Sequence, residues 1–245
     1  MSVRVTSLDD GIVLSLDRPE IGNALGPALV SKLEDAVATA LGAGTRLLAF
    51  RGEGRHFFTG FDLSGLDGQS DGDFLLRFVR VELLLQAVDR APVPTVAVAQ
   101  GRAFGAGADL FVACDRRYCL ADARFAFPGP GFGLVLGNRR LAARIGRDAA
   151  RDLLQTGRVL DAEDAVSLGL APAIIDEGEI AEPLAPQVAH AARQAPETMA
   201  ALRAETAGFS PEADLAALVR SACRPGLKHR IAAYAAARKT ALAKP

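Results

Sequence analysis

Two short stretches of the chain could hold a carbonyl oxygen with backbone N–H groups. Each is a Gly-x-Asp-Leu turn that follows an apolar run and a small loop, at residues 60–63 and, 47 positions later, at residues 107–110. We expect both turns to open a helix, whose first N–H groups lack intrahelical partners. Glycine lets a ligand approach the backbone closely. Two such turns facing one site would make an oxyanion hole, in which fixed donors stabilise the charge that develops on a carbonyl oxygen.

Asp109, in the second turn, carries the side chain that we expect to transfer a proton. A positioned carboxylate is a common general base, and its pKa would be raised by apolar surroundings and lowered by a helix N-terminus. A structural interpretation fits the same pattern: Asp62 and Asp109 would then stabilise the first turns of helices, by about 1 kcal/mol each. His56, which precedes the first turn, is expected to be structural.

Phenylalanines gather around the two turns and predict an apolar pocket. The first turn lies within RHFFTGFDLSGL, residues 55–66, which holds three phenylalanines where the chain leaves a strand. Aromatic side chains are more typical of a pocket or a core than of an exposed turn, and core packing explains some of them equally well. The predicted pocket residues are Phe57, Phe58, Phe104, Phe127 and Phe132.

The turns need strands before them and helices behind them, and the hydrophobic pattern predicts an α/β fold that provides both. Continuous apolar runs predict strands buried on both faces at residues 46–52 and 93–101. Amphipathic spacing predicts helices at residues 26–41 and 73–91. Further short strands are predicted at residues 3–8, 11–19 and 116–127, and mostly helices from residue 137 onward, with the last fifty residues as an appended helical segment.

The composition argues against several classes of function. A formal net charge of −1 over 245 residues provides no field that would attract nucleic acid or an anionic membrane. The three cysteines have no metal-ligand spacing, which predicts buried thiols in a reduced, cytoplasmic protein without a metal site. We expect no signal peptide, because Asp9 and Asp10 interrupt the first apolar run, and no membrane span, because no uninterrupted run of about 18 apolar residues occurs.

Over nearly its whole length the chain resembles the crotonase (enoyl-CoA hydratase/isomerase) superfamily. The resemblance is carried first by the two turns, in RLLAFRGEGRHFFTGFDL (residues 46–63) and GRAFGAGADLFVACDRRYC (residues 101–119). Four more stretches are similar to family signatures: LDRPEIGNAL (residues 16–25), RFAFPGPGFGLVLG (residues 124–137), LLQTGRVLDAEDAVSLGLA (residues 153–171) and LKHRIAAYAAARKTAL (residues 227–242).

This resemblance implies a fold, a ligand and an assembly. The fold would be a crotonase-like spiral of ββα units over residues 1–190, containing an acyl-CoA site, followed by a C-terminal helical oligomerisation region over residues 191–245. The ligand would be an acyl-CoA thioester, so that coenzyme A enters as part of the substrate and no separate cofactor is needed. The assembly would be a homotrimer or a hexamer.

The resemblance also implies roles for single residues. The backbone N–H groups of Phe61 and Ala106 would hold the thioester oxygen of an enolate-like intermediate, and the Phe61 ring would contact the acyl or pantetheine chain. Asp109 takes the position of the first of two glutamates that serve the family's hydratases as general acid and base. The positions that match coenzyme A contacts are Arg18, Lys228 and Lys239, although solvated surface charges would give the same pattern.

At Gly129 the chain departs from the family pattern, because the second glutamate is replaced by a residue without a side chain. A third carboxylate, used by some isomerases, has no clear counterpart near Gly137. Two hypotheses follow. One is an enoyl-CoA hydratase or isomerase in the broad sense, with Asp109 as the only proton-transfer group; the other is a catalytically silent acyl-CoA-binding protein. A dinucleotide dehydrogenase is not expected, because GAGADL lacks the third glycine at Leu110, and neither is a serine hydrolase.

Overall fold

A six-stranded sheet in the order β1-β2-β3-β4-β6-β8 lies at the centre of the molecule. The computed structural model describes residues 2–8, 11–62, 64–176, 186, 189, 193, 195–206 and 210–242, without the side chains of residues 196 and 238–242. β1 is antiparallel to β2, and the other neighbouring pairs are parallel. The strands are β1 (Val3–Leu8), β2 (Gly11–Leu16), β3 (Leu47–Gly52), β4 (Thr95–Ala99), β6 (Arg116–Cys119) and β8 (Ala173–Ile174).

The apolar runs that predicted buried strands form β3 and β4. All five residues of β4 are buried, as are five of the six residues of β3. A strand in the middle of a parallel sheet is covered on both faces, which is why its sequence is continuously apolar instead of alternating.

A second sheet pairs β5 (Arg102–Phe104) with β7 (Arg124–Ala126) in parallel and shows how the chain repeats itself. β4 is followed by β5 and then by a helix, and β6 is followed by β7 and then by helices. An isolated parallel bridge from Phe58 to Ala103 adds the segment after β3 to the same row. The predicted spiral of ββα units is therefore confirmed.

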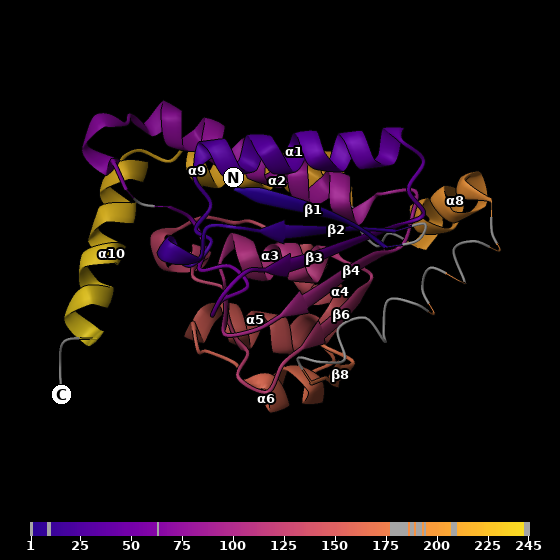
Figure 1. The fold of residues 1–245 in the computed structure, drawn as a ribbon. Helices are drawn as coiled ribbons and strands as arrows, with labels where there is room; N and C mark the ends of the chain where they lie inside the picture. Colours follow the sequence, from indigo (N-terminus) through magenta and orange to yellow (C-terminus); the bar gives the residue numbers. More distant parts are fainter. Residues whose placement is uncertain are drawn as a thin grey trace.

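Helices cover the sheets and form the two ends of the view in Figure 1, where α10 stands at one end and α8 at the other. The predicted helices at residues 26–41 and 73–91 are present as α1 and α2, displaced by at most two residues at each end. The α-helices are α1 (Pro27–Gly42), α2 (Asp71–Asp89), α3 (Ala106–Ala113), α4 (Asn138–Ile145), α5 (Arg147–Thr156), α6 (Ala162–Ser167), α8 (Pro196–Thr206), α9 (Pro211–Ala222) and α10 (Leu227–Leu242), and the 3₁₀ turns are η1 (Pro19–Ile21), η2 (Leu66–Gly68) and η3 (Gly129–Phe132).

The prediction that the first Gly-x-Asp-Leu turn opens a helix was wrong. Phe61 lies in a parallel β-bridge with Leu25, and the next α-helix begins only at Asp71. The reason is a stronger start signal further along: Ser70 and Asp73 form a capping box, in which each side chain accepts a hydrogen bond from the other's backbone N–H.

The same capping box settles the role of a serine that has the spacing of a hydrolase nucleophile. Residues 68–72 read Gly-Gln-Ser-Asp-Gly, which matches Gly-x-Ser-x-Gly. The Ser70 hydroxyl donates to the Asp73 carboxylate at 2.7 Å and caps α2 at the surface, so it serves the helix and not a nucleophilic site.

The C-terminal region is helical, as predicted. α9 packs against α2, and α10 packs against η3 and α2. The predicted boundary between residues 190 and 191 falls outside the described residues and stays a prediction. None of the described helices combines the length and the apolar character that crossing a membrane requires.

Candidate active site

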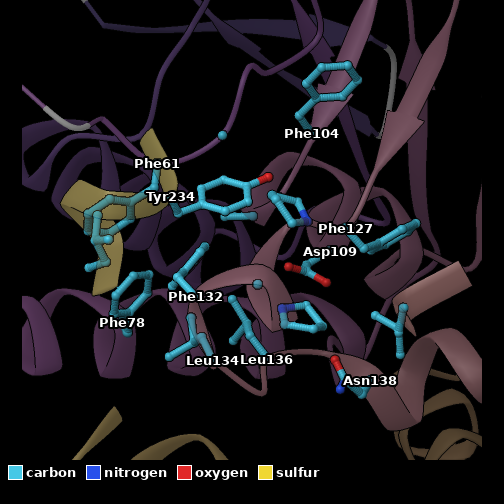
Figure 2. Close-up of a pocket in the computed structure, with 18 of the residues that line it drawn as sticks. Phe61, Phe78, Phe104, Asp109, Phe127, Phe132, Leu134, Leu136, Asn138 and Tyr234 are labelled. Atoms are coloured by element: carbon cyan, nitrogen blue, oxygen red, sulfur yellow. The ribbon is translucent and has the colours of Figure 1, made fainter. Parts of the chain in front are cut away.

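An apolar cavity of about 130 Å³ lies where the two turns, η3 and α10 meet (Figure 2). Polar side chains reach its wall at Thr59, Asp109, Asn138 and Tyr234. The apolar side chains of the wall include Phe61, Phe78, Phe104, Phe127, Pro128, Pro130, Phe132, Leu134, Leu136, Leu154 and Ile231.

Phe61 of the first turn lies in the wall of this cavity. Leu25 donates its N–H to the Gly60 carbonyl at 2.8 Å, and Asp62 donates its N–H to the Leu25 carbonyl at 3.1 Å. In a parallel bridge of this kind the central residue, Phe61, points its own N–H away from the strand that it pairs with. Within the part of the chain that the structure describes, this N–H has no backbone acceptor.

Ala106 of the second turn also lies in the cavity wall. Gly105, at φ +54°, donates its N–H to the Ala126 carbonyl at 2.8 Å and precedes α3. Ala106 is the first residue of α3, where an N–H has no intrahelical partner. The helix dipole adds a partial positive charge at this end of α3.

The two turns are in direct contact, and glycine makes the contact possible. Gly60 has φ +100°, and a β-carbon at this position would lie 3.0 Å from the Phe104 carbonyl oxygen. A β-carbon on Gly105 would lie 3.8 Å from the Gly60 Cα. A side chain at Gly60 would therefore push the two turns apart, whereas Gly105 is constrained by its φ of +54°, a conformation that residues with a side chain rarely adopt.

Asn23 holds the segment that leads into the first turn. Its side chain is fully buried, accepts a hydrogen bond from the Arg18 N–H at 2.8 Å, and donates to the carbonyls of Glu53 and His56 at 3.0 and 2.8 Å. The sequence analysis did not single out Asn23, although it lies in the stretch LDRPEIGNAL. His56 accepts the Arg102 N–H at its Nδ1 atom, 3.2 Å away, which agrees with the structural role expected for it.

Arg77 and Phe78 of α2 hold the ring of Phe61 from two sides. The Arg77 guanidinium carbon lies 3.9 Å from the Phe61 ring centroid, and the Phe78 ring stacks on it at 4.4 Å. Two groups this close to one centroid occupy opposite faces of the ring. Arg77 also donates to the Asp62 carbonyl at 2.6 Å and to the Gln69 side chain at 2.7 Å, so the first turn is held by both its ring and its backbone.

Asp109 lies one helical turn after Ala106, which puts both on one face of α3. The side chain is 6% exposed and reaches the cavity wall. Burial raises the pKa of Asp109 well above its usual value, while Arg140 acts to lower it and Glu82 to raise it. The effect of burial on the pKa of Asp109 therefore outweighs the opposite effect of the nearby Arg140 guanidinium.

Gly137 gives the Asp109 carboxylate its room. A β-carbon on Gly137 would lie 2.5 Å from Asp109 Oδ1, and Gly137 has φ +67°, a conformation that residues with a side chain rarely adopt. Gly137 is also the residue before α4, so the carboxylate faces the positive end of that helix.

A buried ion pair lies behind Asp109. Arg140 donates to both carboxylate oxygens of Glu82, at 3.0 and 2.5 Å, and each side chain is only 1% exposed. Removing one partner of a buried ion pair destabilises the fold, because the other partner is left as an uncompensated charge. The pair joins α2 to α4, and these helices contribute Phe78 and Asn138 to the cavity wall.

Three of the predicted pocket phenylalanines, Phe104, Phe127 and Phe132, line the cavity. The prediction for Phe57 and Phe58 was wrong, because both rings are buried in the main core. Phe58 packs under α3 so closely that a β-carbon on Gly107 would lie 2.5 Å from its side chain.

Gly129 lies in the cavity wall, where the missing second glutamate would be expected. A β-carbon there would lie 3.2 Å from the Leu134 carbonyl oxygen, so the backbone leaves little space for a larger residue. Among the described residues of the wall, Asp109 is the only carboxylic acid.

Two of the residues predicted to contact coenzyme A, Arg18 and Lys228, are not among the residues that line this cavity. Arg18 pairs with Glu20 at 3.5 Å beside a separate surface hollow, and the Lys228 ammonium donates to the Asp67 carbonyl at 2.8 Å. Lys239 belongs to α10, and its side chain lies outside the described residues. Within the described parts of the chain no group of His, Cys, Asp and Glu side chains is arranged to hold a metal ion.

Comparisons with known proteins agree on one family. The family model described as enoyl-CoA hydratase/isomerase matches residues 10–220. A protein of Mycobacterium leprae named as a probable enoyl-CoA hydratase is 35% identical over 176 residues, which is 69% of either chain, and one of Bacillus subtilis with the same kind of name is 30% identical over 78% of this chain and 76% of its own. A solved structure from Bordetella parapertussis, described as an enoyl-CoA hydratase/isomerase, superposes with a TM-score of 0.93 at 40% identity and covers both chains completely.

Proposed function

The chain belongs to the enoyl-CoA hydratase/isomerase family, and we propose that it binds an acyl-CoA thioester and transfers a proton at the carbon next to the thioester through an enolate. The observation that supports the proposal is that Phe61, Ala106 and Asp109 all line one apolar cavity, where the two backbone N–H groups would hold the oxygen and the carboxyl group would take the proton. Proton abstraction beside a carbonyl needs donors for the oxygen and a base for the carbon.

The two N–H groups act on the thioester oxygen. As the proton leaves the α-carbon, negative charge moves onto this oxygen, and donors that are already in place stabilise it without reorganisation. One such donor contributes about 3 kcal/mol of barrier stabilisation in enzymes where it has been removed. Because both donors belong to the backbone, they are preserved when the side chain of Phe61 serves as part of the cavity wall.

Asp109 accepts the α-proton in its carboxylate form. The raised pKa makes this carboxylate a stronger base than an exposed one. The rate should therefore rise with pH as Asp109 loses its proton and level off above its pKa.

Deuterium exchange tests the proposal without assuming which product forms. Butyryl-CoA or phenylacetyl-CoA is incubated with the protein in D₂O, and mass spectrometry follows deuterium uptake at the α-carbon. We expect uptake with the unaltered protein and none with Asp109→Asn, whose affinity for acyl-CoA should be nearly unchanged. Asp148→Asn, an exposed change in the first turn of α5, is the matched control and should exchange normally.

A silent acyl-CoA-binding protein is the second candidate, and Gly129 is the observation that favours it. The wall of the cavity has one carboxylic acid instead of the pair that the family's hydratases use. Tight binding of both ligands without any deuterium uptake would support this second function and contradict the first.

The family resemblance also supports a proposal for the oligomeric state and the cellular compartment. We propose a homotrimer or a hexamer in the cytoplasm. Light scattering coupled to size-exclusion chromatography measures the mass in solution, and a monomer at working concentration would contradict the assembly.

A further inference from the structure

A second space beside the cavity is lined by cations. It has a volume of about 980 Å³, against about 130 Å³ for the cavity. Four arginines lie in its wall, Arg139, Arg147, Arg151 and Arg224, and we call this space the arginine groove. Among the described residues that line it there is no aspartate or glutamate. In a chain whose formal net charge is −1, this groove has a field of one sign, which attracts an anion.

The arginine groove adjoins the cavity over a wide part of its wall. Seven residues line both spaces, and they include Leu134, Asn138 of α4 and Leu154 of α5. A third hollow, of about 390 Å³, shares only Phe61 with the cavity. For an acyl group whose α-carbon lies beside Asp109, the arginine groove is therefore the larger neighbouring space.

We propose that the acyl group of the ligand carries a carboxylate at its far end and that Arg147 and Arg151 bind this carboxylate. The inference names a substrate class for the proposed site, so it rests on the proposed function. A guanidinium group presents parallel N–H donors that match the two oxygens of a carboxylate. Dicarboxylic acyl-CoA thioesters have this chemistry, because one carboxyl group forms the thioester and the other stays free.

Helix α5 brings these arginines next to the cavity. Leu154 lines both spaces, Arg151 lies three residues before Leu154, and Arg147 lies four residues before Arg151. Residues three and four apart share one face of a helix. Measured along the helix axis, Arg151 lies about 4.5 Å and Arg147 about 10.5 Å from Leu154. One face of α5 thus passes from an apolar residue at the cavity to two cations in the groove.

The four arginines of the groove differ in what they already bind. Arg139 pairs with Asp214 at 2.7 Å, and Arg224 donates to a backbone carbonyl at 3.4 Å. Arg147 and Arg151 are exposed, and their side chains make no hydrogen bond or ion pair within the part of the chain that the structure describes. These two can therefore turn toward an anion without giving up another partner.

Gly129 keeps the boundary between the two spaces free of negative charge. It lies in the cavity wall between Pro128 and Pro130, and both prolines line the cavity and the groove. A carboxylate side chain at this position would repel a ligand anion beside it, because like charges placed together are unfavourable. Among the described residues of both walls, Asp109 is then the only carboxylic acid.

Isothermal titration calorimetry with matched pairs of ligands tests the inference. Adipyl-CoA and hexanoyl-CoA have acyl chains of equal length and differ only in a terminal carboxylate against a methyl group. Glutaryl-CoA and valeryl-CoA form a second pair, one carbon shorter. Because all four ligands carry the same coenzyme A phosphates, the ratio of Kd values within a pair reports only the carboxylate. We expect the dicarboxylic ligand of at least one pair to bind about tenfold more tightly, as one charge-assisted hydrogen bond at a solvent-open site allows.

Arg151→Met is the test variant, because methionine keeps an unbranched side chain and removes the charge. The ratio of Kd values within the responsive pair should fall to within about twofold of one, which is a loss of most of the preference. Arg147→Met should lower the same ratio. Arg116→Met is the matched control, since Arg116 is an exposed arginine of β6 that lines neither space, and it should keep the ratio of the unaltered protein.

Other results would overturn the inference and show what takes its place. Equal Kd values within both pairs would mean that the groove binds no carboxylate, and the proposed function would stand. If Arg151→Met weakens both members of a pair by the same factor, the arginines bind the coenzyme A phosphates instead. A change in mass on Arg151→Met, measured by light scattering, would assign the groove to a contact between copies of the chain. Failure of all four ligands to bind the unaltered protein would overturn the proposed function as well.

Discussion

Asp109 combines the catalytic placement that we propose with a cost in stability. Its carboxyl group is 6% exposed beside an apolar cavity, and the space for it exists because Gly137 has no side chain. Burial penalises the charged form, and Arg140, which already pairs with Glu82, compensates for only part of that penalty. Residues that are placed for catalysis commonly weaken the fold in this way.

The stability of the protein should therefore depend on the protonation of Asp109. The pKa is raised in the folded state above the ordinary value of 3.8, so the folded protein binds this proton more tightly than the unfolded chain does. The stability that comes from the protonated group is complete below about pH 4 and is lost as the pH rises through the raised pKa. Asp109→Asn stays neutral, so its free energy of unfolding should exceed that of the unaltered protein by an amount that grows with pH.

Urea unfolding between pH 4 and pH 9 measures this difference. Asp148→Asn should show no comparable trend, because its side chain is exposed. A difference for Asp109→Asn that stays constant across the range would contradict the prediction.

At the scale of elements, α2 connects the cavity to the core. Its inner face contributes Phe78 to the cavity wall and Glu82 to the ion pair with Arg140. Five residues before Glu82, Arg77 holds the ring of Phe61 and the backbone of Asp62. The placement of Phe61, whose N–H is the first proposed donor, thus depends on a helix that begins ten residues later in the chain.

Arg77→Met should leave the first turn less firmly held, without removing a residue from the cavity wall. The change removes a guanidinium that stacks on Phe61 and donates to the Asp62 carbonyl, which together stabilise the turn by about 2 kcal/mol. We expect the rate of α-proton exchange to fall by about tenfold, equivalent to about 1.4 kcal/mol of barrier, with little change in KM. This makes Arg77 a positioning residue.

Steady-state kinetics of exchange with butyryl-CoA provides the measurement. Arg80→Met is the matched control, because Arg80 lies on the same helix but pairs with Glu34 of α1. A rise in KM with an unchanged rate constant would show instead that Arg77 acts on ligand binding.

At the scale of the whole molecule, the cavity lies between the ββα core and the C-terminal helices. The core supplies both turns and η3, whereas α10 supplies Ile231 and Tyr234. A ligand that fills this space contacts both parts at once, so its binding should resist the separation of α10 from the core.

Saturation with an acyl-CoA should therefore raise the melting temperature. At a ligand concentration of 100 times Kd the stabilisation is about 2.7 kcal/mol, which for a chain of this size corresponds to roughly 5–10 °C. Differential scanning fluorimetry with butyryl-CoA tests this, and Asp109→Asn should show the same shift. Coenzyme A without an acyl group should give a smaller shift, and an equal shift from both ligands would contradict the placement of the acyl chain in the cavity.

Local patterns in the sequence were sufficient for most of the fold. β3 and β4 are buried on two faces and therefore have continuously apolar sequences, whereas α1 and α2 are buried on one face and have amphipathic spacing. Neighbouring residues alone reveal both patterns. The resemblance added the order of the ββα units and the family. The turn at Ala106 was predictable for the same reason, because a glycine, a helix start and Asp109 lie within five residues.

Other features depended on contacts between residues far apart in the chain, and only the tertiary structure decided them. The bridge from Phe61 to Leu25 replaced the helix start that the first turn predicted, and packing under Gly107 placed Phe58 in the core instead of the pocket. Tyr234 reaches the cavity from a helix about a hundred residues after η3, so nothing near it in the sequence marks it as part of the site. The sequence by itself determined most of the elements and the presence of a carboxylic acid at the start of α3, because these depend on local periodicity and residue type. Which side chains surround that carboxylate depended on how distant segments pack.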